Sequence, residues 1–331
     1  MAQHLLPFEA VQRKVIVRKE SETDLRYGCH PDKRPVDVLI NYGVIDLNKP
    51  KGPTSHQVSD YVQKILHIDK AGHAGTLDPG VTGVLPIATG RATRIVQTLL
   101  PAGKEYVAIM HLHKPVPLEE LKKVLSAFVG KIKQLPPIKS AVKRVLRERS
   151  IYYLEIMEVE QQDVLFRIGC QAGTYIRKFC HDVGQKLGTG AHMAELIRTK
   201  AGPFNADKMV TLQDLADAYW YWKNESNEDL IRKRIMPVEA GIIHLAKVWI
   251  MDNAVDTICH GAVLNVPGIS KLHTGINKDD PVAVMTLKDE FVALGKAEIT
   301  SDEMASKEHG PAVKISKVFM EPGTYPKYKK E

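Results

Sequence analysis

The chain has 331 residues, of which 44% are hydrophobic and 26% charged, with a formal net charge of +7. This composition is typical of a soluble globular protein of about two domains. No stretch approaches the ~20 apolar residues of a membrane span, and the start lacks the apolar core of a signal peptide. The charge favours an anionic partner, most commonly nucleic acid, over a basic protein without one. The four cysteines form no C-x-x-C pair, so we expect a cytoplasmic protein without a zinc or thioredoxin-like site.

The first 35 residues form a polar, basic arm that we expect to dock on another part of the protein. Within it, Val15-Ile16-Val17 predicts one short strand, and compact structure is expected to begin near Val36. The turn-rich segment 49–53 then precedes a helix that Thr54 or Ser55 caps. Apolar residues recur there at helical spacing and predict one buried face: Val58, Tyr61, Val62, Ile65 and Leu66.

The loop from Gly72 to Gly83 holds a single carboxylate, Asp78, among small and apolar residues. Glycines permit backbone angles that side chains forbid and let a ligand come close, and Pro79 favours an extended conformation at Asp78. From this stretch alone, two interpretations stay open. The loop is either a glycine-rich turn with a surface aspartate or a device that aims one carboxylate at a ligand.

Next come a predicted strand over 106–113, a helix over 118–129 that ends at Gly130, and a half-buried strand over 164–170. Between the helix and the last strand, Pro136-Pro137 interrupts regular structure. It opens a basic loop in which only Glu148 opposes five cations: Lys139, Lys143, Arg144, Arg147 and Arg149. The loop is either a solvated turn or a phosphate-binding loop, and its charge density favours the second.

After Gly173, a helix is predicted whose apolar face comprises Ile176, Phe179, Cys180, Val183 and Leu187. Arg177 lies in its first turn, off that face. Since the helix dipole disfavours a cation there, Arg177 needs an anionic partner or water. The run Tyr219-Trp220-Tyr221-Trp222 is interpreted as core or interdomain packing. From Val248 onward, short strands separated by turns predict a small β-rich domain.

Four segments resemble, in order, the motifs of the TruB-type RNA pseudouridine synthases: Lys49 to Ser55, His73 to Gly83, Gly173 to Arg177 and Ala191 to Arg198. Pro136-Pro137 with Ser140 to Arg144 is similar to the basic thumb loop of that family, and residues 246–322 resemble a PUA domain. The segment 104–108, the thumb and the basic arm resemble the dyskerin-type branch in its short archaeal form. That branch is the guide-RNA-dependent enzyme of box H/ACA particles. Two residues depart from these patterns: Ala74 stands where the family usually has Gly or Ser, and Asp279 stands where PUA domains usually have Gly.

The resemblance implies an α+β fold in which a mixed, mainly antiparallel sheet is flanked by helices and followed by a small β-rich PUA domain. We expect a basic arm over residues 1–35 that packs on the PUA domain, and a catalytic domain over 36–245 with its thumb at about 136–150. The PUA domain is expected over 246–322 and a basic tail over 323–331.

Conversion of uridine to pseudouridine breaks the N1–C1′ bond, rotates the base and joins C5 to C1′. No atom is gained or lost, so no cofactor and no metal are expected. The resemblance makes Asp78 the catalytic carboxylate, and carboxylates suit reactions at sugar carbons. Attack by Asp78 on the sugar, attack on the base, and abstraction of a sugar proton all stay open.

The resemblance also pairs Asp78 with Arg177, and a nearby cation favours the ionised form of a carboxylate. At ~4 Å and an effective dielectric near 20, such a pair is worth about 4 kcal/mol before desolvation, enough to fix its geometry. Tyr106 resembles the tyrosine that stacks on the target base and assists removal of the C5 proton, although a tyrosine at a strand start also serves packing.

The target base must leave its stack to react. His73 resembles the residue that supports the flipped nucleotide, with a structural loop histidine as the alternative. Leu196 resembles a pocket wall, which is also a core role. Lys143 is assigned to substrate binding, and Lys49 contacts phosphates or stabilises loops rather than taking part in the chemistry. RNA binding is assigned to four further thumb residues: Lys139, Arg144, Arg147 and Arg149.

The function implied is guide-dependent pseudouridylation of ribosomal RNA within an H/ACA particle. The partners implied are the guide RNA, the substrate RNA and three small proteins: a zinc-ribbon-like peptide, a small β-barrel protein and a kink-turn-binding protein. One alternative is a stand-alone enzyme for the T-loop uridine of tRNA, although the span between Asp78 and Tyr106 is short for the extra residues of such enzymes. The other alternative, a non-catalytic RNA-binding scaffold, is opposed by the intact set of Asp78, Tyr106 and Arg177.

Overall fold

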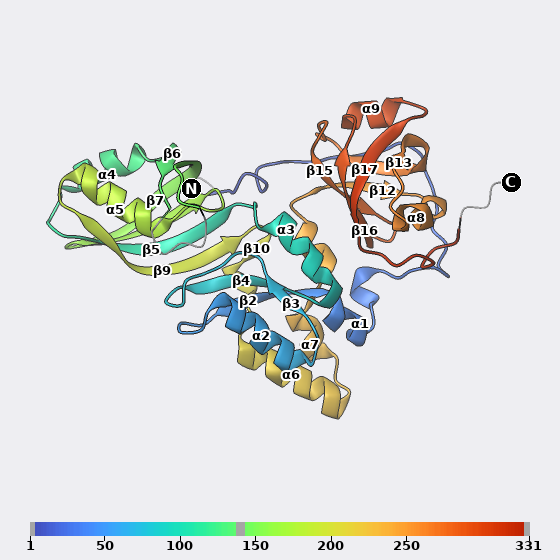
Figure 1. Cartoon of the computed structure of the whole chain (residues 1–331), viewed down its shortest axis with the longest axis horizontal. Helices are drawn as coiled ribbons and strands as arrows, with labels where there is room; N and C mark the ends of the chain where they lie inside the picture. The colour runs from blue at the N-terminus through green and yellow to red at the C-terminus, as the bar shows by residue number, and fades with distance from the viewer. Residues whose placement is uncertain (1–3, 137–142, 328–331) are drawn as a thin grey trace.

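The computed structural model describes residues 4–136 and 143–327. Over these ranges the chain forms a ten-stranded sheet and a seven-stranded sheet, each covered by helices (Figure 1). The ten-stranded sheet lies in the larger unit, and the seven-stranded sheet lies in the C-terminal unit and gains one strand from the arm. The predicted α+β class with a small β-rich C-terminal domain is therefore confirmed.

The larger sheet is mixed and mainly antiparallel, as predicted. Its strands follow the order β11 (Met236–Pro237), β2 (Gly43–Lys49), β4 (Thr82–Thr89), β9 (Ala191–Ala201), β5 (Lys104–Leu112), β8 (Asp163–Cys170), β7 (Arg147–Glu160) and β6 (Gly130–Gln134). Two short strands join at the side: β3 (Ala71–His73) pairs with β4, and β10 (Phe204–Asn205) pairs with β9. The parallel pairing of β4 with β9 lies at the centre and joins the two halves of the sheet.

Each half of this sheet has its own apolar core. Over β2 and β4 pack α1 (Val36–Asn41), α2 (Ser55–Leu66), α6 (Leu212–Glu225) and α7 (Asp229–Arg234). Over β5, β8 and β7 pack α4 (Leu118–Ser126) and α5 (Ile176–Leu187). The seam between the halves therefore runs along β4 and β9 (Figure 1).

Local sequence signals explain the helix ends. Thr54 caps α2 in a reciprocal capping box with Gln57, and the buried side chains lie on one face: Val58, Val62 and Leu66. The helix predicted over 118–129 is shorter than expected, because α4 ends at Ser126. Gly130, predicted as a helix stop, instead begins strand β6 with a φ of 102°. That backbone angle favours glycine.

The smaller sheet has the order β1 (Val15–Val17), β14 (Ile269–His273), β12 (Ala246–Ile250), β15 (Pro281–Met285), β16 (Phe291–Ala297), β17 (Pro311–Val318) and β13 (Leu264–Asn265). Two helices accompany it, α8 (Asp252–Cys259) and α9 (Ser301–Ser306). The short strand predicted in the arm is confirmed as β1, which pairs antiparallel with β14. The arm thereby adds an edge strand to a sheet built more than 200 residues later in the chain.

The start of the arm contacts the larger unit as well. Leu6 is fully buried, and its side chain lies close to Gly103 and Tyr152. Nearby, the Lys200 ammonium pairs with the Glu9 carboxylate at 3.0 Å. The arm therefore spans both units, whereas the sequence analysis placed it on the PUA domain alone.

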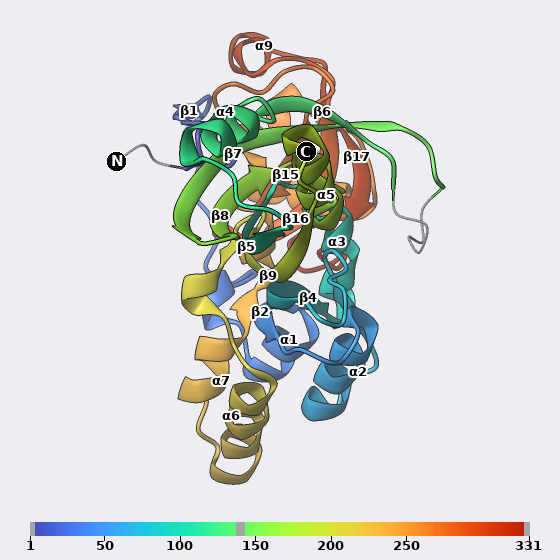
Figure 2. The same cartoon turned by 90° about the vertical axis from the view of Figure 1, so that its left-hand side faces the viewer.

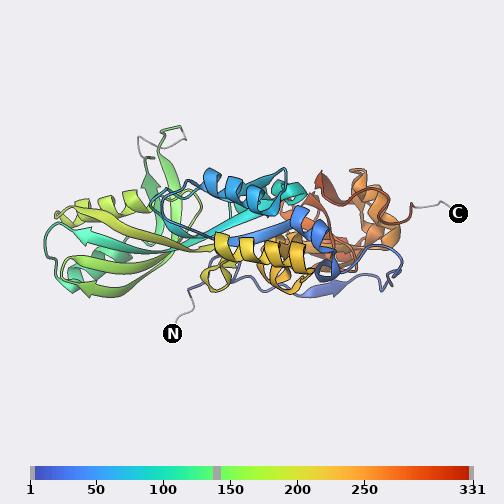
Figure 3. The ribbon, with the colours of Figure 1, turned by 90° about the horizontal axis from the view of Figure 1, so that it is seen from below.

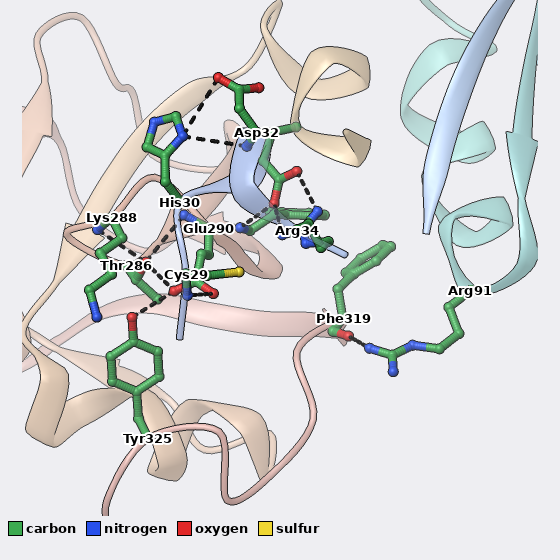
Figure 4. Close-up of polar contacts among 12 residues, drawn as sticks. Cys29, His30, Asp32, Arg34, Arg91, Thr286, Lys288, Glu290, Phe319 and Tyr325 are labelled. Atoms are coloured by element: carbon green, nitrogen blue, oxygen red, sulfur yellow. Dashed lines mark hydrogen bonds and ion pairs between the residues drawn. The ribbon is translucent and has the colours of Figure 1, made fainter. Parts of the chain in front are cut away.

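A buried polar cluster, here called the arm clasp, fastens the arm to the C-terminal unit (Figure 4). It consists of Cys29, Thr286, Glu290 and Tyr325. The Glu290 carboxylate accepts hydrogen bonds from the Cys29 backbone N–H at 3.0 Å and from the hydroxyls of Tyr325 at 2.6 Å and Thr286 at 3.2 Å. Tyr325 falls in the segment predicted as a basic tail, yet its side chain is buried. Residues 328–331 lie outside the described residues.

The two units share an apolar core, built on aromatic side chains from both: Tyr42, Phe204, Trp249, Phe291 and Phe319. Beside it, the Arg34 guanidinium pairs in a bidentate manner with the Glu239 carboxylate at 3.0 and 3.1 Å, and both side chains are nearly buried. The relative position of the units is therefore fixed by packing. Among the helices of residues 4–136 and 143–327, none combines the length and apolar character that a membrane span requires.

Candidate active site

Asp78 lies in the loop between β3 and β4, at the seam of the larger sheet. Three backbone carbonyls around the loop accept hydrogen bonds from the Lys49 ammonium: Pro50 at 2.9 Å, Pro79 at 3.2 Å and Val81 at 3.0 Å. Lys49 has no exposed surface, so burial lowers its pKa while the Asp78 charge opposes that shift. Of the two roles predicted for Lys49, the structure supports stabilisation of a loop.

Two further buried side chains hold the same loop. The Ser55 hydroxyl, at the start of α2, donates to the Leu77 carbonyl at 3.1 Å and accepts from the Leu77 backbone N–H at 2.9 Å. Arg198, on β9, donates to the Gly75 carbonyl at 3.0 Å and to the Val84 carbonyl at 2.7 Å. Residues 75–81 are therefore tied to α2, β2 and β9 at once.

Asp78 pairs with Arg177, as predicted from the resemblance. Arg177 Nη2 donates to Asp78 Oδ2 at 2.5 Å, and Arg177 lies in the first turn of α5. The side chains are 59% and 58% exposed, for Arg177 and Asp78 respectively. Exposed ion pairs contribute ~0–1 kcal/mol, so the net strength of this pair is well below the about 4 kcal/mol expected before desolvation. The buried contacts of Lys49, Ser55 and Arg198 fix the loop instead.

Tyr106 lies on β5, beside the seam, and its neighbour across β9 is Arg198. The pairing of the two strands shifts register between Glu105 and Tyr106, a β-bulge of the kind often found next to active sites. Burial raises the pKa of the Tyr106 hydroxyl, and the positive charge of the neighbouring Arg198 partly offsets this shift. At neutral pH the hydroxyl is therefore protonated, and Arg198 links it to the Asp78 loop.

His73 and Leu196 lie on the strands that flank this loop. His73 ends β3, and its ring meets that of His56 edge to face at 4.8 Å. Burial, followed by the nearby charges of His56 and Arg198, lowers the pKa of His73 to about 4, so its ring is neutral at pH 7. Leu196, on β9, is half-buried and packs against the core of the second half of the sheet.

The thumb residues project from the larger sheet, where residues 143–146 leave the start of β7 (Figures 2 and 3). Lys143 and Arg144 are exposed, whereas Arg147 and Arg149 are half-buried. Arg149 lies against the turn that precedes α5, since a Cβ at Gly173 would come 3.2 Å from its guanidinium. Lys139 lies outside the described residues.

Several buried groups next to the site were not singled out from the sequence. Ser55 was predicted only as one of two alternative helix caps and as part of a motif, and Arg198 only as part of a motif; the hydrogen bonds of both to the loop were not predicted. Lys104 is nearly buried and donates to the carbonyls of Leu99 at 2.9 Å and Ala102 at 2.7 Å. Burial and the neighbouring Arg198 lower the pKa of Lys104 to about 7. Burial raises the pKa of Asp46 to about 7, while Arg198 opposes that shift.

Comparison with protein families matches four consecutive parts of the chain. Residues 63–176 match the N-terminal domain of the TruB family of pseudouridylate synthases, and 177–242 match the C-terminal domain of tRNA pseudouridylate synthase B. Residues 246–319 match the PUA domain and 5–59 the DKCLD domain. A probable tRNA pseudouridine synthase B from Pyrococcus abyssi is 55% identical over 98% of this chain and 97% of its own length.

The chain belongs to the TruB family of pseudouridine synthases. It is an RNA pseudouridine synthase, an enzyme of the isomerase class, and it carries a PUA domain. The archaeal relatives include a protein of the same description from Methanopyrus kandleri, which is 56% identical over 97% of this chain and 95% of its own length.

This TruB-family chain is similar in structure to the archaeal dyskerin-type enzymes. The matched chain in an H/ACA RNP bound to a substrate RNA containing 2′-deoxyuridine has a TM-score of 0.93 and 52% identity, over 98% of this chain and 100% of that one. A Cbf5–Nop10–Gar1 complex gives a TM-score of 0.93 and 55% identity, over 98% of both chains. The likeness covers the arm, the larger unit and the PUA domain together.

Proposed function

We propose that this TruB-family enzyme is the catalytic subunit of an H/ACA guide-RNA particle and that it isomerises specific uridines of ribosomal RNA. The observation that carries the proposal is the match over 98% of the chain to a structure of an H/ACA RNP bound to substrate RNA. The protein partners implied are relatives of the Nop10 and Gar1 of the similar complex, with a kink-turn-binding protein on the guide RNA. The thumb cations would hold RNA phosphates.

Asp78 is the catalytic carboxylate in this proposal. Its support is geometric: the loop presents an exposed carboxylate, paired with Arg177 at 2.5 Å, and Arg198, which donates to the loop, is the cross-strand neighbour of Tyr106. When the substrate covers the pair, water leaves and the ion pair strengthens, because the local dielectric falls. Arg177 then holds the carboxylate of Asp78 in a fixed position during the reaction.

The target base would sit between the Asp78 loop and β5. Breaking N1–C1′ and forming C5–C1′ requires that C5 loses a proton and N1 gains one. Tyr106 lies beside the loop, where its ring can stack on the base and its hydroxyl can take part in that proton transfer. The neutral His73 ring, at the entry to the loop, would support the flipped nucleotide, and Leu196 would line the pocket.

The test is release of tritium from C5 of labelled uridine in a guide-paired ribosomal fragment, with the guide RNA and partner proteins present. Asp78→Asn keeps the side-chain volume and removes the charge, so we expect RNA binding to persist and product to fall by at least ~10³-fold. Pseudouridine formation at the wild-type rate by Asp78→Asn would refute the catalytic assignment.

A second function is favoured by the relatives, which are described as probable tRNA pseudouridine synthases. In that case the isolated enzyme would modify the T-loop uridine of tRNA without a guide. The same tritium assay on unmodified tRNA separates the two functions. Product only with guide RNA supports the H/ACA proposal, and product on tRNA alone supports the stand-alone activity.

A further inference from the structure

The aromatic run of residues 219–222 divides between the core and the surface. Tyr219 and Trp222 pack against the core under α2 and α6, in agreement with the prediction that this run is core. The prediction is wrong for the other two, because Trp220 is 53% exposed and Tyr221 is 38% exposed. Their rings meet edge to face at 5.3 Å. The fold therefore does not need the Trp220 indole for its core.

Trp220 borders a surface groove of about 430 Å³, between the C-terminal ends of α2 and α6, which lie side by side (Figures 1 and 2). Its volume is in the ~300–1,000 Å³ range of small-ligand sites. Eight residues line it: Lys64, Ile65, His67, Ala216, Tyr219, Trp220, Lys223 and Asn224. No carboxylate is among them, so the lining carries positive charge beside aromatic and aliphatic surface.

The cations and rings of the groove are arranged closely. The Lys223 ammonium lies 5.9 Å from the centroid of the Tyr219 ring and 4.0 Å from that of Trp222, a ring that packs on the core and does not line the groove. The His67 ring lies 5.4 Å from the Tyr219 ring. His67 also has a φ of 50°, in the left-handed region that a non-glycine residue enters at a cost of ~1–2 kcal/mol. The backbone thus holds an imidazole where glycine would be easier.

We propose that this groove binds one nucleotide of a single-stranded RNA segment, outside the catalytic pocket. The base would stack on the Trp220 indole and the Tyr219 ring, and Lys64 and Lys223 would contact the adjoining phosphates. Aromatic rings flanked by cations are the arrangement by which proteins hold single-stranded RNA without reading its sequence. The proposal rests on RNA being the substrate of this chain, which the pseudouridine synthase family provides.

The position of the groove suits an RNA strand that reaches the catalytic loop. Helix α2 has 12 residues and is therefore ~18 Å long. Its first residue, Ser55, holds the Asp78 loop, and its last turn contributes Lys64 and Ile65 to the groove. A few nucleotides span that length, so an RNA segment continuous with the substrate or guide strand can occupy both places.

The test uses the full chain and a single-stranded RNA of mixed sequence that carries 5-iodouridine, which photo-crosslinks to aromatic side chains. We expect peptide mapping to find crosslinks at Trp220 or Tyr219. Trp220→Ala should weaken RNA affinity and raise the KM of the isomerisation by ~5- to 100-fold, the loss of one stacked base. Trp220→Phe should recover most of it. The double change Lys64→Ala with Lys223→Ala should reduce the salt dependence of binding by about two phosphate contacts.

The matched control is Tyr61→Ala, an exposed aromatic side chain on α2 that does not line the groove. It should leave RNA affinity and KM within twofold of wild type. The proposal is refuted if crosslinks avoid the groove and Trp220→Ala keeps wild-type affinity. Loss of binding to a partner protein in Trp220→Ala, with RNA affinity intact, would refute it as well and assign the groove to a protein segment. A loss of kcat without a loss of RNA affinity in Trp220→Ala would also refute the proposal. The corresponding loss in Asp78→Asn tests the proposed catalytic site and not the groove.

Discussion

Ser55→Ala tests whether buried contacts, rather than the exposed ion pair, position the catalytic loop. The Ser55 hydroxyl satisfies both backbone groups of Leu77, the residue before Asp78, at 3.1 and 2.9 Å. Leu77 and Ser55 are both buried, and each buried polar group left without a partner costs ~1–3 kcal/mol. The loop can avoid part of this cost by shifting toward water, which displaces Asp78.

We expect Ser55→Ala to destabilise the loop position required for catalysis by about 2 kcal/mol. The Leu77 N–H and carbonyl both lose their partner, and relaxation of the loop recovers part of that cost. Because 1.36 kcal/mol corresponds to a factor of ten, kcat should fall ~30-fold. KM should stay near its wild-type value, because the proposed RNA contacts lie on the thumb and in the groove between α2 and α6, and none of them involves Ser55. The assay is tritium release from C5 at saturating RNA, together with a thermal unfolding curve of each variant.

Ser59→Ala is the control, as it makes the same change one turn later on α2. Ser59 is also buried, but its hydroxyl donates to the Ser55 carbonyl within the helix and does not reach the loop. We expect its kcat within twofold of wild type. Equal kcat values for Ser55→Ala and wild type would refute the argument that this hydroxyl positions Asp78, and equal losses in both variants would attribute the effect to helix stability.

Three further predictions concern stability. Burial raises the pKa of Asp46 to about 7 in the folded state, so between about pH 4 and 7 the folded protein binds more protons at this group than the unfolded chain does. Ionisation of Asp46 therefore destabilises the fold as the pH rises. Asp46→Asn should have a higher Tm than wild type at pH 8 but not at pH 5, and a Tm difference independent of pH would contradict this. Gly83→Ala should lower the free energy of unfolding by at least ~3 kcal/mol and abolish activity, because φ is 102° there and a Cβ would lie 2.2 Å from the Arg198 carbonyl oxygen. The control is Gly80→Ala, which has open space around it and should unfold like wild type. Gly28→Ala would force a Cβ to within 2.3 Å of a carboxylate oxygen of the arm clasp, so we expect ~2 kcal/mol lower stability and faster proteolysis of the arm.

The sequence predicted most of the fold because its local signals agree with the packing. The helix over 55–66 has a capping residue and an apolar stripe, and the structure contains both, although Tyr61 of that stripe is exposed. The mixed sheet and the β-rich domain were predicted partly from alternation and partly from resemblance. The end of α4 was missed because residues 127–129 are still apolar; in the structure Phe128 and Val129 bond back only three residues, and β6 begins at Gly130.

The candidate site was predicted less completely. Asp78 stood out because a carboxylate among glycines is unusual, and the pairing with Arg177 came from resemblance. The roles of Ser55 and Arg198 could not be read from spacing, because their partners are backbone carbonyls and amides, which leave no signal in a sequence. Trp220 was misassigned for a related reason: an aromatic run has no strict helical period, so it does not reveal which ring faces outward.

The division between exposed and buried groups explains how such a site can stay ordered while open. In the proposed mechanism Asp78 and Arg177 must reach a nucleotide, so neither can be buried in the free enzyme, and the pair itself contributes little stability. The backbone around Asp78 is instead held by hydrogen bonds from the buried side chains of Lys49, Ser55 and Arg198, whose partners are main-chain atoms. Preorganisation therefore resides in the loop's backbone. Substrate binding has only to exclude water from a carboxylate and a guanidinium that already face each other.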